Sequence, residues 1–286
     1  MLLSKRLVTI LLAVCATGAA LAADPYEAAL RKANIPTPQE GLSQYLLSLV
    51  PSDENAERAA QLVLQLANDN FLAREEAELA LSTMPHPPLD LLQQATQSND
   101  PETRYRAKSV LKKIERGGGR STTQAVYGYV ARNEIPGLAF PILQYMPHSG
   151  ETSAFGLSSQ AVLATVTKDD LDLLRRAIKR KYAVRRAIAV RALAKLQGEK
   201  ATDELLPLLK HEDAIVRLAA AQSLANLGRR ESLPTLIELL AADDLEIRAR
   251  SVNILRDFTH QQFQFTAYDN EFDRRAAIER WRKWWA

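Results

Sequence analysis

A short pattern recurs along the chain at nearly constant spacing, and it constrains the fold more than any other feature of the sequence. With Asp213 as position 0 in HEDAIVRLAAAQSLANLG, Arg217 stands at +4, Ala220 at +7, Leu224 at +11 and Leu227 at +14. Copies start at residues 70, 100, 151, 182, 213 and 244, with steps of 30, 51, 31, 31 and 31. All copies except the one at 151 keep the arginine. Such regularity indicates an internal repeat of about 31 residues.

The pattern predicts an α-helix in each copy. Offsets +7, +11 and +14 share one helix face, and Asp or Asn at position 0 suits a helix N-cap. Tyr182 and Glu151 cannot cap in this way, so we expect their helices to begin less sharply. We expect the arginines to link each repeat to the next. The predicted ladder consists of Asn70, Arg74, Asp100, Arg104, Arg186, Asp213, Arg217, Asp244 and Arg248.

A second amphipathic segment precedes each marked helix, for example ELLPLLKH before Asp213 and LPTLIELLA before Asp244. A single helical hairpin cannot bury its apolar stripe, whereas stacked hairpins can. Aromatic residues make up only 6% of the chain and β-branched runs are few, which also favours helix. The sequence therefore predicts an all-α, right-handed α-solenoid of about six hairpins with one inserted helix and a Trp-rich C-terminal cap.

The residues that form this pattern resemble a known family. DAIVRLAAAQSLANLG resembles the second helix of short HEAT-like repeats of the PBS-lyase type, and the resemblance covers roughly residues 54–258. NDNFLAREEAELALSTM followed by NDPETRYRAKSVLKKIE resembles a repeat module common in secreted or membrane-attached bacterial proteins. The resemblance implies an α-solenoid that binds other macromolecules. It implies no chemistry, because a bilin lyase acts in a bilin-producing cytoplasm and this chain carries a secretion signal.

The predicted organisation follows from the repeat and its interruptions. It consists of a signal peptide (1–22), an N-terminal lead-in with a first helix (23–53), repeats 1–2 (54–116), a Gly-rich joint with an inserted helix (117–135), repeats 3–6 (136–258) and a C-terminal cap (259–286). The three glycines at 117–119 are not a phosphate loop, because no Gly-Lys-Ser/Thr follows them. The expected cap residues are Ile278, Trp281, Trp284 and Trp285. A Trp-rich amphipathic end that touches a membrane interface is the alternative to a cap.

The N-terminus has the pattern of a secretion signal. Lys5 and Arg6 precede an apolar run that ends in Ala-Leu-Ala, which predicts cleavage after Ala22. The run is also long enough for an uncleaved anchor, whereas the bulky Val14 argues against lipidation of Cys15. After cleavage the chain would hold no cysteine and no transmembrane span. We therefore expect a secreted or periplasmic bacterial protein.

Basic residues gather in the fourth predicted hairpin, without any acid between Leu173 and Gly198. A solvated face is the ordinary interpretation of such a run, and a patch for an anionic partner is the alternative. Acidic protein surfaces, anionic lipids and acidic glycans are suitable partners in the envelope, and nucleic acid is not expected there. The candidate patch consists of Arg175, Arg176, Lys179, Arg180, Lys181, Arg185, Arg191 and Lys195.

The sequence contains no catalytic motif that we recognise. The four histidines have no ligand spacing such as HExxH, and no Gly-x-Ser-x-Gly occurs. His211, Glu212 and Asp213 are consecutive, and we expect that they cannot all face one ion. We therefore expect no catalytic residues, no cofactor and no metal. A catalytic site assembled across repeats would leave no local motif.

These features favour a non-enzymatic scaffold or adaptor in the cell envelope or periplasm, with protein partners that the sequence does not identify. A binder of anionic lipid or glycan through residues 173–198 is the second hypothesis, and an enzyme of unknown class is the third.

Overall fold

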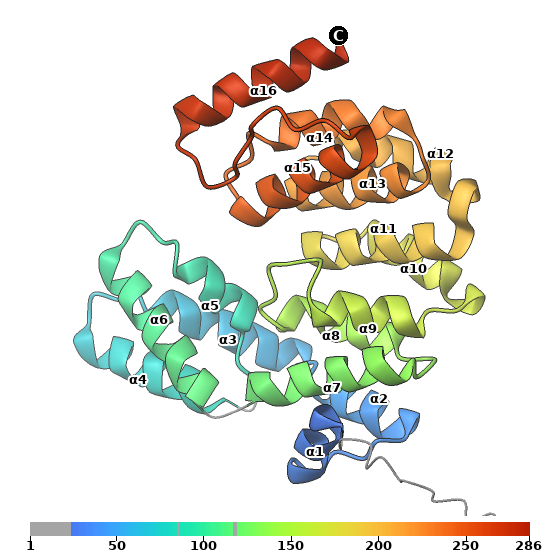
Figure 1. Ribbon diagram of the computed structural model, residues 1–286. Helices are drawn as coiled ribbons and strands as arrows, with labels where there is room; N and C mark the ends of the chain where they lie inside the picture. Colours follow the sequence, from blue (N-terminus) through green and yellow to red (C-terminus); the bar gives the residue numbers. More distant parts are fainter. Residues whose placement is uncertain (1–23, 85, 117–118) are drawn as a thin grey trace, which may run out of the picture.

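The computed structural model describes residues 24–84, 86–116 and 119–286. The predicted signal segment, including Cys15, therefore lies outside the described residues. All regular structure in the described ranges is helical, and the predicted all-α solenoid is confirmed (Figure 1). Among the described residues, no helix combines the length and the apolar character that crossing a bilayer requires.

Six helical hairpins form the array, and each has a first and a second helix (Figure 1). In chain order they are α3 (Asp53–Gln65) with α4 (Phe71–Thr83), α5 (Leu89–Ala95) with α6 (Pro101–Arg116), α8 (Ala139–Tyr145) with α9 (Leu157–Thr165), α10 (Leu171–Ile178) with α11 (Ala183–Gln197), α12 (Thr202–Leu205) and the 3₁₀ helix η4 (Leu206–Lys210) with α13 (Ala214–Asn226), and α14 (Leu233–Leu239) with α15 (Leu245–Thr259). Short 3₁₀ turns connect some of them: η1 (Met146–His148), η2 (Lys168–Asp170), η3 (Gly198–Ala201) and η5 (Arg230–Ser232).

The repeat pattern marks the contact face of each second helix. The small residues at +7 are fully buried, and they are Ala77, Ala107, Ala189, Ala220 and Ser251. At +11, Leu81, Leu193, Leu224 and Leu255 are also fully buried. A small side chain lets the neighbouring helix approach closely, and the leucines fill the layer between helices at the density of a protein interior. The periodicity therefore predicts the side of each helix that packs against its neighbour.

The repeat arginines act mainly inside their own hairpin, which corrects the expected ladder. Arg217 Nη1 donates to the carbonyls of His211 and Glu212, both at 2.7 Å. Arg74, Arg104 and Arg248 make the same pair of bonds to the carbonyls six and five residues before them. These carbonyls belong to the turn after the first helix, where backbone acceptors lack a helical partner. We call this interaction the arginine clasp.

Only some of the predicted ladder residues link one hairpin to the next. Arg186 Nη1 lies 3.1 Å from the Asp213 carboxylate, and Arg74 Nε lies 3.5 Å from that of Glu102. Asp100 caps its own helix, accepting from the N–H of Thr103 at 2.7 Å, and Asp244 does the same for Ile247 at 3.0 Å. Most ladder residues therefore organise one hairpin, because a side chain at +4 reaches back over the preceding turn more easily than across to the next repeat.

A buried charge network that the sequence pattern does not mark joins the first two hairpins. Arg106 lies 2.7 Å from both Glu75 and Glu102 and 2.8 Å from Glu78. Burial opposes the negative charge of Glu78, but hydrogen bonds from Lys113 and Ser109 keep its pKa below the usual value. The Arg106 and Glu78 side chains are both largely buried. Removing either one would therefore leave the other as a buried charge without a partner.

The N-terminal lead-in contains two helices, α1 (Pro25–Lys32) and α2 (Gln39–Ser48), where the sequence analysis expected one. Helix α1 packs mainly on α7 (Gly119–Asn133), and α2 packs mainly on α8 (Figure 1). A Cβ atom on Gly128 of α7 would come within 2.4 Å of the Tyr26 ring, so this glycine allows α1 to lie directly against α7. The inserted helix thus provides a surface that the start of the chain covers.

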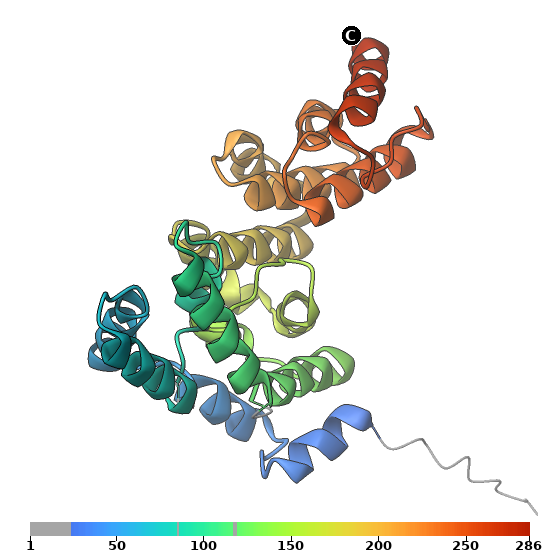
Figure 2. The same cartoon turned by 90° about the vertical axis from the view of Figure 1, so that its left-hand side faces the viewer.

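The core is divided accordingly. One small cluster lies within hairpins 1 and 2 and consists of Leu66, Ala77, Leu81, Leu92, Ala107 and Val110. The large cluster runs from α1 and α2 through α7 to the C-terminal helix. Figures 1 and 2 show α3–α6 as a lobe beside this longer stack. The break coincides with the glycines of the 51-residue step, so the repeats do not form one uniform array.

The degenerate copy at Glu151 departs most from the pattern. Its helix α9 begins only at Leu157, after a loop that carries Phe155 in place of the arginine. Tyr182 likewise makes no side-chain cap, although α11 begins at the expected residue, Ala183. The sequence predicts that the copy at Glu151 begins its helix less sharply, and its helix α9 indeed begins several residues later than the pattern would place it.

The C-terminal helix α16 (Glu271–Trp285) is a further copy of the pattern that the sequence analysis missed. Asn270 caps it, and Arg274 donates to the Asp269 carbonyl at 2.5 Å, as in the other clasps. Ala277 at +7 and Trp281 at +11 are buried. The step of 26 residues from Asp244 hid this copy, because the segment before α16 contains no first helix.

The arginine clasp generates the first prediction. Replacing Arg217 by Ala removes two charge-assisted hydrogen bonds and leaves two turn carbonyls without their partner, so we expect the free energy of unfolding to fall by about 1–2 kcal/mol. Urea denaturation followed by circular dichroism measures this. Arg230, an exposed arginine in the next loop, provides the control, and R230A should change stability by less than about 0.5 kcal/mol. Equal losses in the two variants would contradict a structural role of the clasp.

Candidate partner-binding groove

A cavity of about 580 Å³ lies where the lobe of hairpin 2 faces the later repeats. Its lining comes from α5, from the loop at 150–155 and from the starts of α11, α13 and α15. The second helices of successive hairpins begin on the same side of the stack (Figure 1), so their first turns line up along one wall. We call this cavity the groove.

The floor of the groove is apolar and contains Phe155, Val184, Ile215 and Ile247. Phe155 is 9% exposed. Two guanidinium groups contact its ring, with the Arg191 and Arg250 Cζ atoms 4.7 and 4.2 Å from the ring centroid. A cation over the face of an aromatic ring is a favourable electrostatic arrangement. The residue that replaces the repeat arginine is therefore a positioned part of the groove floor.

Arg191 is a structural residue beneath this floor. Its guanidinium donates to the Ala154 carbonyl at 2.8 Å and to the Ser159 hydroxyl. Burial and the nearby charge of Arg250 lower its pKa to about 10. A cation held in this way is not available to an external anion, which removes Arg191 from the predicted basic patch.

Acidic side chains dominate the rim. The groove is lined by five carboxylates and one lysine, namely Asp90, Glu151, Asp213, Asp244, Glu246 and Lys181. Glu246 is 2.8 Å from Arg250 and accepts from Ser153, and Asp213 pairs with Arg186. Asp90 has no ion pair with any described lysine or arginine, and burial raises its pKa. A half-buried carboxylate without a cation favours a basic group on whatever fills the groove.

Three neutral amide side chains also line the groove, Gln93 and Gln94 on α5 and Gln97 in the turn that follows it. Each primary amide offers two N–H donors and one carbonyl acceptor. This combination suits the backbone of an extended peptide, which presents both kinds of group. The groove therefore combines an apolar floor with amides and carboxylates, and Asp90 lies on the same helix as Gln93 and Gln94.

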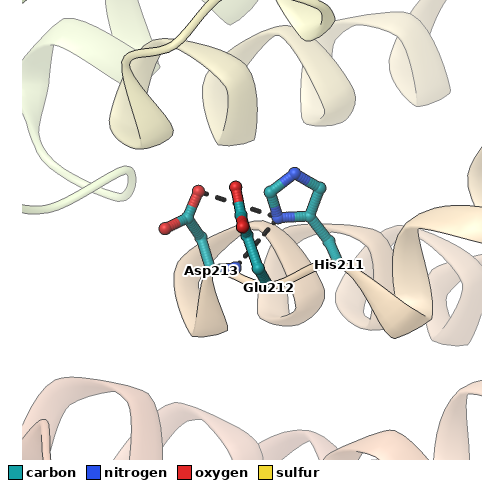
Figure 3. Close-up of side chains that lie close together, drawn as sticks. All are labelled: His211, Glu212 and Asp213. Carbon is teal, nitrogen blue, oxygen red and sulfur yellow. Dashed lines mark hydrogen bonds and ion pairs between the residues drawn. The ribbon is translucent and has the colours of Figure 1, made fainter.

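His211, Glu212 and Asp213 stand beside the groove, and the expectation that they cannot face one point is wrong (Figure 3). One potential ligand atom from each lies within 4.8 Å of the others, because the chain is extended at His211 and at Asp213 before α13 begins. The Asp213 N–H donates to His211 Nδ1 at 3.0 Å. Arg186 Nη1 lies 2.5 Å from His211 Nε2 and 3.1 Å from the Asp213 carboxylate. His211 and Asp213 thus both contact the Arg186 guanidinium, whose positive charge would repel a metal cation.

The predicted basic patch is divided among several surroundings. Arg175 makes two hydrogen bonds to Glu204, at 3.0 and 2.9 Å, and Lys195 donates to the Leu163 carbonyl. Lys181 lines the groove, and Lys179 is exposed near the Glu204 charge. Arg176, Arg180 and Arg185 come together at a separate small pocket. The run is continuous in sequence, but helical periodicity turns its members toward different faces.

The predicted cap residues lie on α16 at the end of the stack. Ile278 and Trp281 are buried, whereas Trp284 and Trp285 are 40% and 41% exposed. Trp281 and Trp284 both pack on Phe263, with ring centroids 4.8 and 6.1 Å away. The helix thus closes the large core at its C-terminal end, with one aromatic face still in contact with solvent.

Two histidines that are far apart in sequence line one cavity, which the sequence analysis did not anticipate. His86 and His148 both face a space of about 250 Å³, together with Tyr45 and Tyr145. Burial lowers the pKa of His148, and the charge of Arg185 acts in the same direction. His86 lies just before α5 and His148 lies in η1, and the contact between α5 and η1 brings these segments together. Proline next to each histidine, Pro87 and Pro147, is the one sequence signal that they share.

Comparison with known families supports the repeat assignment over part of the chain. The family of HEAT repeats matches residues 171–256, which span hairpins 4 to 6. HEAT repeats generally mediate protein–protein interaction. The comparison with curated proteins finds no match.

The groove floor generates the second prediction. Replacing Phe155 by Ala removes a buried ring and its contacts with the Arg191 and Arg250 guanidinium groups. We expect the free energy of unfolding to fall by about 3–5 kcal/mol, measured by urea denaturation. Phe272 is 81% exposed and serves as the control, with an expected change below about 0.5 kcal/mol for F272A. A small loss in F155A would show that the ring is not packed as described.

Proposed function

We propose that the protein is a non-enzymatic scaffold that holds an extended segment of a protein partner in the groove. The observation that carries this proposal is the groove itself, an open cavity of about 580 Å³ lined by residues of five hairpins. Its shape suits a chain better than a small molecule, because its lining follows successive helix starts. The similarity of residues 171–256 to HEAT repeats supports the same class of function.

The charges of the groove indicate the kind of segment. Of the five carboxylates that line the groove, Asp213 and Glu246 pair with arginines, whereas Asp90 has no ion pair with a described lysine or arginine and favours a basic side chain on the partner. The apolar floor around Phe155 favours at least one apolar side chain between them. The amides of α5 can bond the partner backbone whatever its sequence. We infer a basic and apolar peptide segment in extended conformation.

The cell envelope is the proposed location. The support is the basic start, the apolar run and the Ala-Leu-Ala ending at residues 20–22. In that compartment a scaffold would hold a secreted or membrane-attached partner. An anionic surface bound along the whole stretch 173–198 has less support, because Arg175 and Arg186 are already paired and the Arg191 guanidinium is bound beneath the groove floor.

The third prediction tests the groove against the basic stretch. Gln97 and Thr152 are exposed, and both line the groove. Placing arginine at both positions adds positive charge opposite a basic partner, so we expect affinity for the crosslinked partner to fall at least about tenfold. Crosslinking in the envelope fraction identifies the partner, and titration of the purified pair measures the affinity.

Two controls define the outcome. Gln160 on α9 is exposed and does not line the groove, so Q160R makes the same chemical change and should leave affinity unchanged. A variant with Arg175, Arg176, Lys179 and Arg180 all replaced by Gln should also bind normally. If the last variant loses binding while Q97R/T152R keeps it, the partner binds the basic stretch and the groove proposal fails.

A further inference from the structure

Three arginines converge on a small pocket in the first-helix layer, away from the groove. The pocket has a volume of about 100 Å³, and its lining comes from α8, α10 and the start of α11. Arg176 and Arg180 come from α10 and the turn after it, and Arg185 comes from the first turn of α11. Gln144 and Phe140 on α8 complete the site, and Phe140 is 50% exposed.

None of the three arginines has an acidic partner in the described part of the chain, and no carboxylate lines the pocket. The neighbouring Arg175 shows the contrast, since its guanidinium is bound at two points by Glu204. Like charges gathered without a counter-ion raise the free energy of the protein, and a bound anion would lower it.

Arg185 is the least satisfied of the three. Its Nε is buried and has no hydrogen-bond partner, and its Nη1 makes only a long bond of 3.5 Å to the Leu143 carbonyl. Burial and the charge of Arg180 both lower its pKa. A buried guanidinium N–H without an acceptor costs free energy, so the site lacks an acceptor as well as a negative charge.

The surrounding backbone holds the site in place. The carbonyl of Arg180 accepts two bonds from Arg186, the repeat arginine of this hairpin, at 3.1 Å from Nε and 2.7 Å from Nη2. This fixes the turn that carries Arg180 relative to α11.

We propose that this pocket binds a phosphate group. Three planar guanidinium forks and one amide offer more N–H donors than the two oxygens of a carboxylate accept, whereas a phosphate presents several oxygens in a tetrahedral arrangement. The phosphate belongs either to a soluble ligand or to a lipid headgroup, and the same pocket chemistry serves both. Phe140 at the mouth provides an apolar contact for the group that carries the phosphate.

Titration of the full chain with inorganic phosphate at constant ionic strength tests the proposal, with isothermal calorimetry as the measurement. We expect saturable binding, and we expect R180Q and R185Q each to raise the Kd about tenfold or more, because each removes a charge-assisted hydrogen bond. R180Q alters an exposed side chain, so it keeps the test valid if R185Q folds poorly. R175Q removes the same charge from α10 but leaves the pocket intact, and its Kd should stay within about twofold.

Vesicles distinguish the two sources of phosphate. Co-sedimentation with phosphatidylcholine vesicles that contain phosphatidic acid, reversed by added phosphate and lost in R180Q, assigns the pocket to a lipid headgroup. Phosphate binding without vesicle binding assigns it to a soluble ligand. The proposal is overturned if phosphate shows no saturable binding, or if R175Q weakens binding as much as R180Q and R185Q do, since the attraction would then be general to the charge of the surface.

Discussion

The arginine clasp is the interaction on which the rest of the structure depends. The turn between the two helices of a hairpin leaves backbone carbonyls without helical partners, and the arginine at +4 binds two of them in the same way in four repeats. The bond fixes the angle between the end of the first helix and the start of the second. A repeated local geometry then becomes a repeated stacking geometry, because each hairpin presents the same buried face to the next.

The groove is a consequence of this regularity and of its one interruption. The first turns of α11, α13 and α15 line one wall of the groove, and Asp213, Asp244 and Glu246 are its acidic residues. The loop that replaces the clasp in the third hairpin instead brings Phe155 to the floor, in contact with Arg191 and Arg250. The lobe formed by hairpins 1 and 2 supplies the opposite rim. A uniform solenoid would have the wall but neither this floor nor the facing rim.

The two proposed sites have opposite charge and lie in different layers of the same hairpins. The groove is acidic and follows the starts of the second helices, whereas the pocket of Arg176, Arg180 and Arg185 is basic and lies among the first helices. Arg186 connects the groove and the pocket, since it donates to the carbonyl of Arg180 and also pairs with the carboxylate of Asp213. One residue of the repeat therefore helps to position both a rim group and a pocket group.

The sequence alone indicated the helical hairpins, their spacing and the buried positions at +7 and +11, because helix periodicity and capping are local properties that a 31-residue repeat reports several times. It did not show that α1 and α2 cover α7 and α8, that the core is divided, or that α16 is another copy. It also grouped eight basic residues that the folded chain separates into paired, buried, exposed and pocket-lining side chains. These features come from contacts between segments distant in sequence, and from the direction in which each helix turns its side chains, so only the tertiary structure decides them.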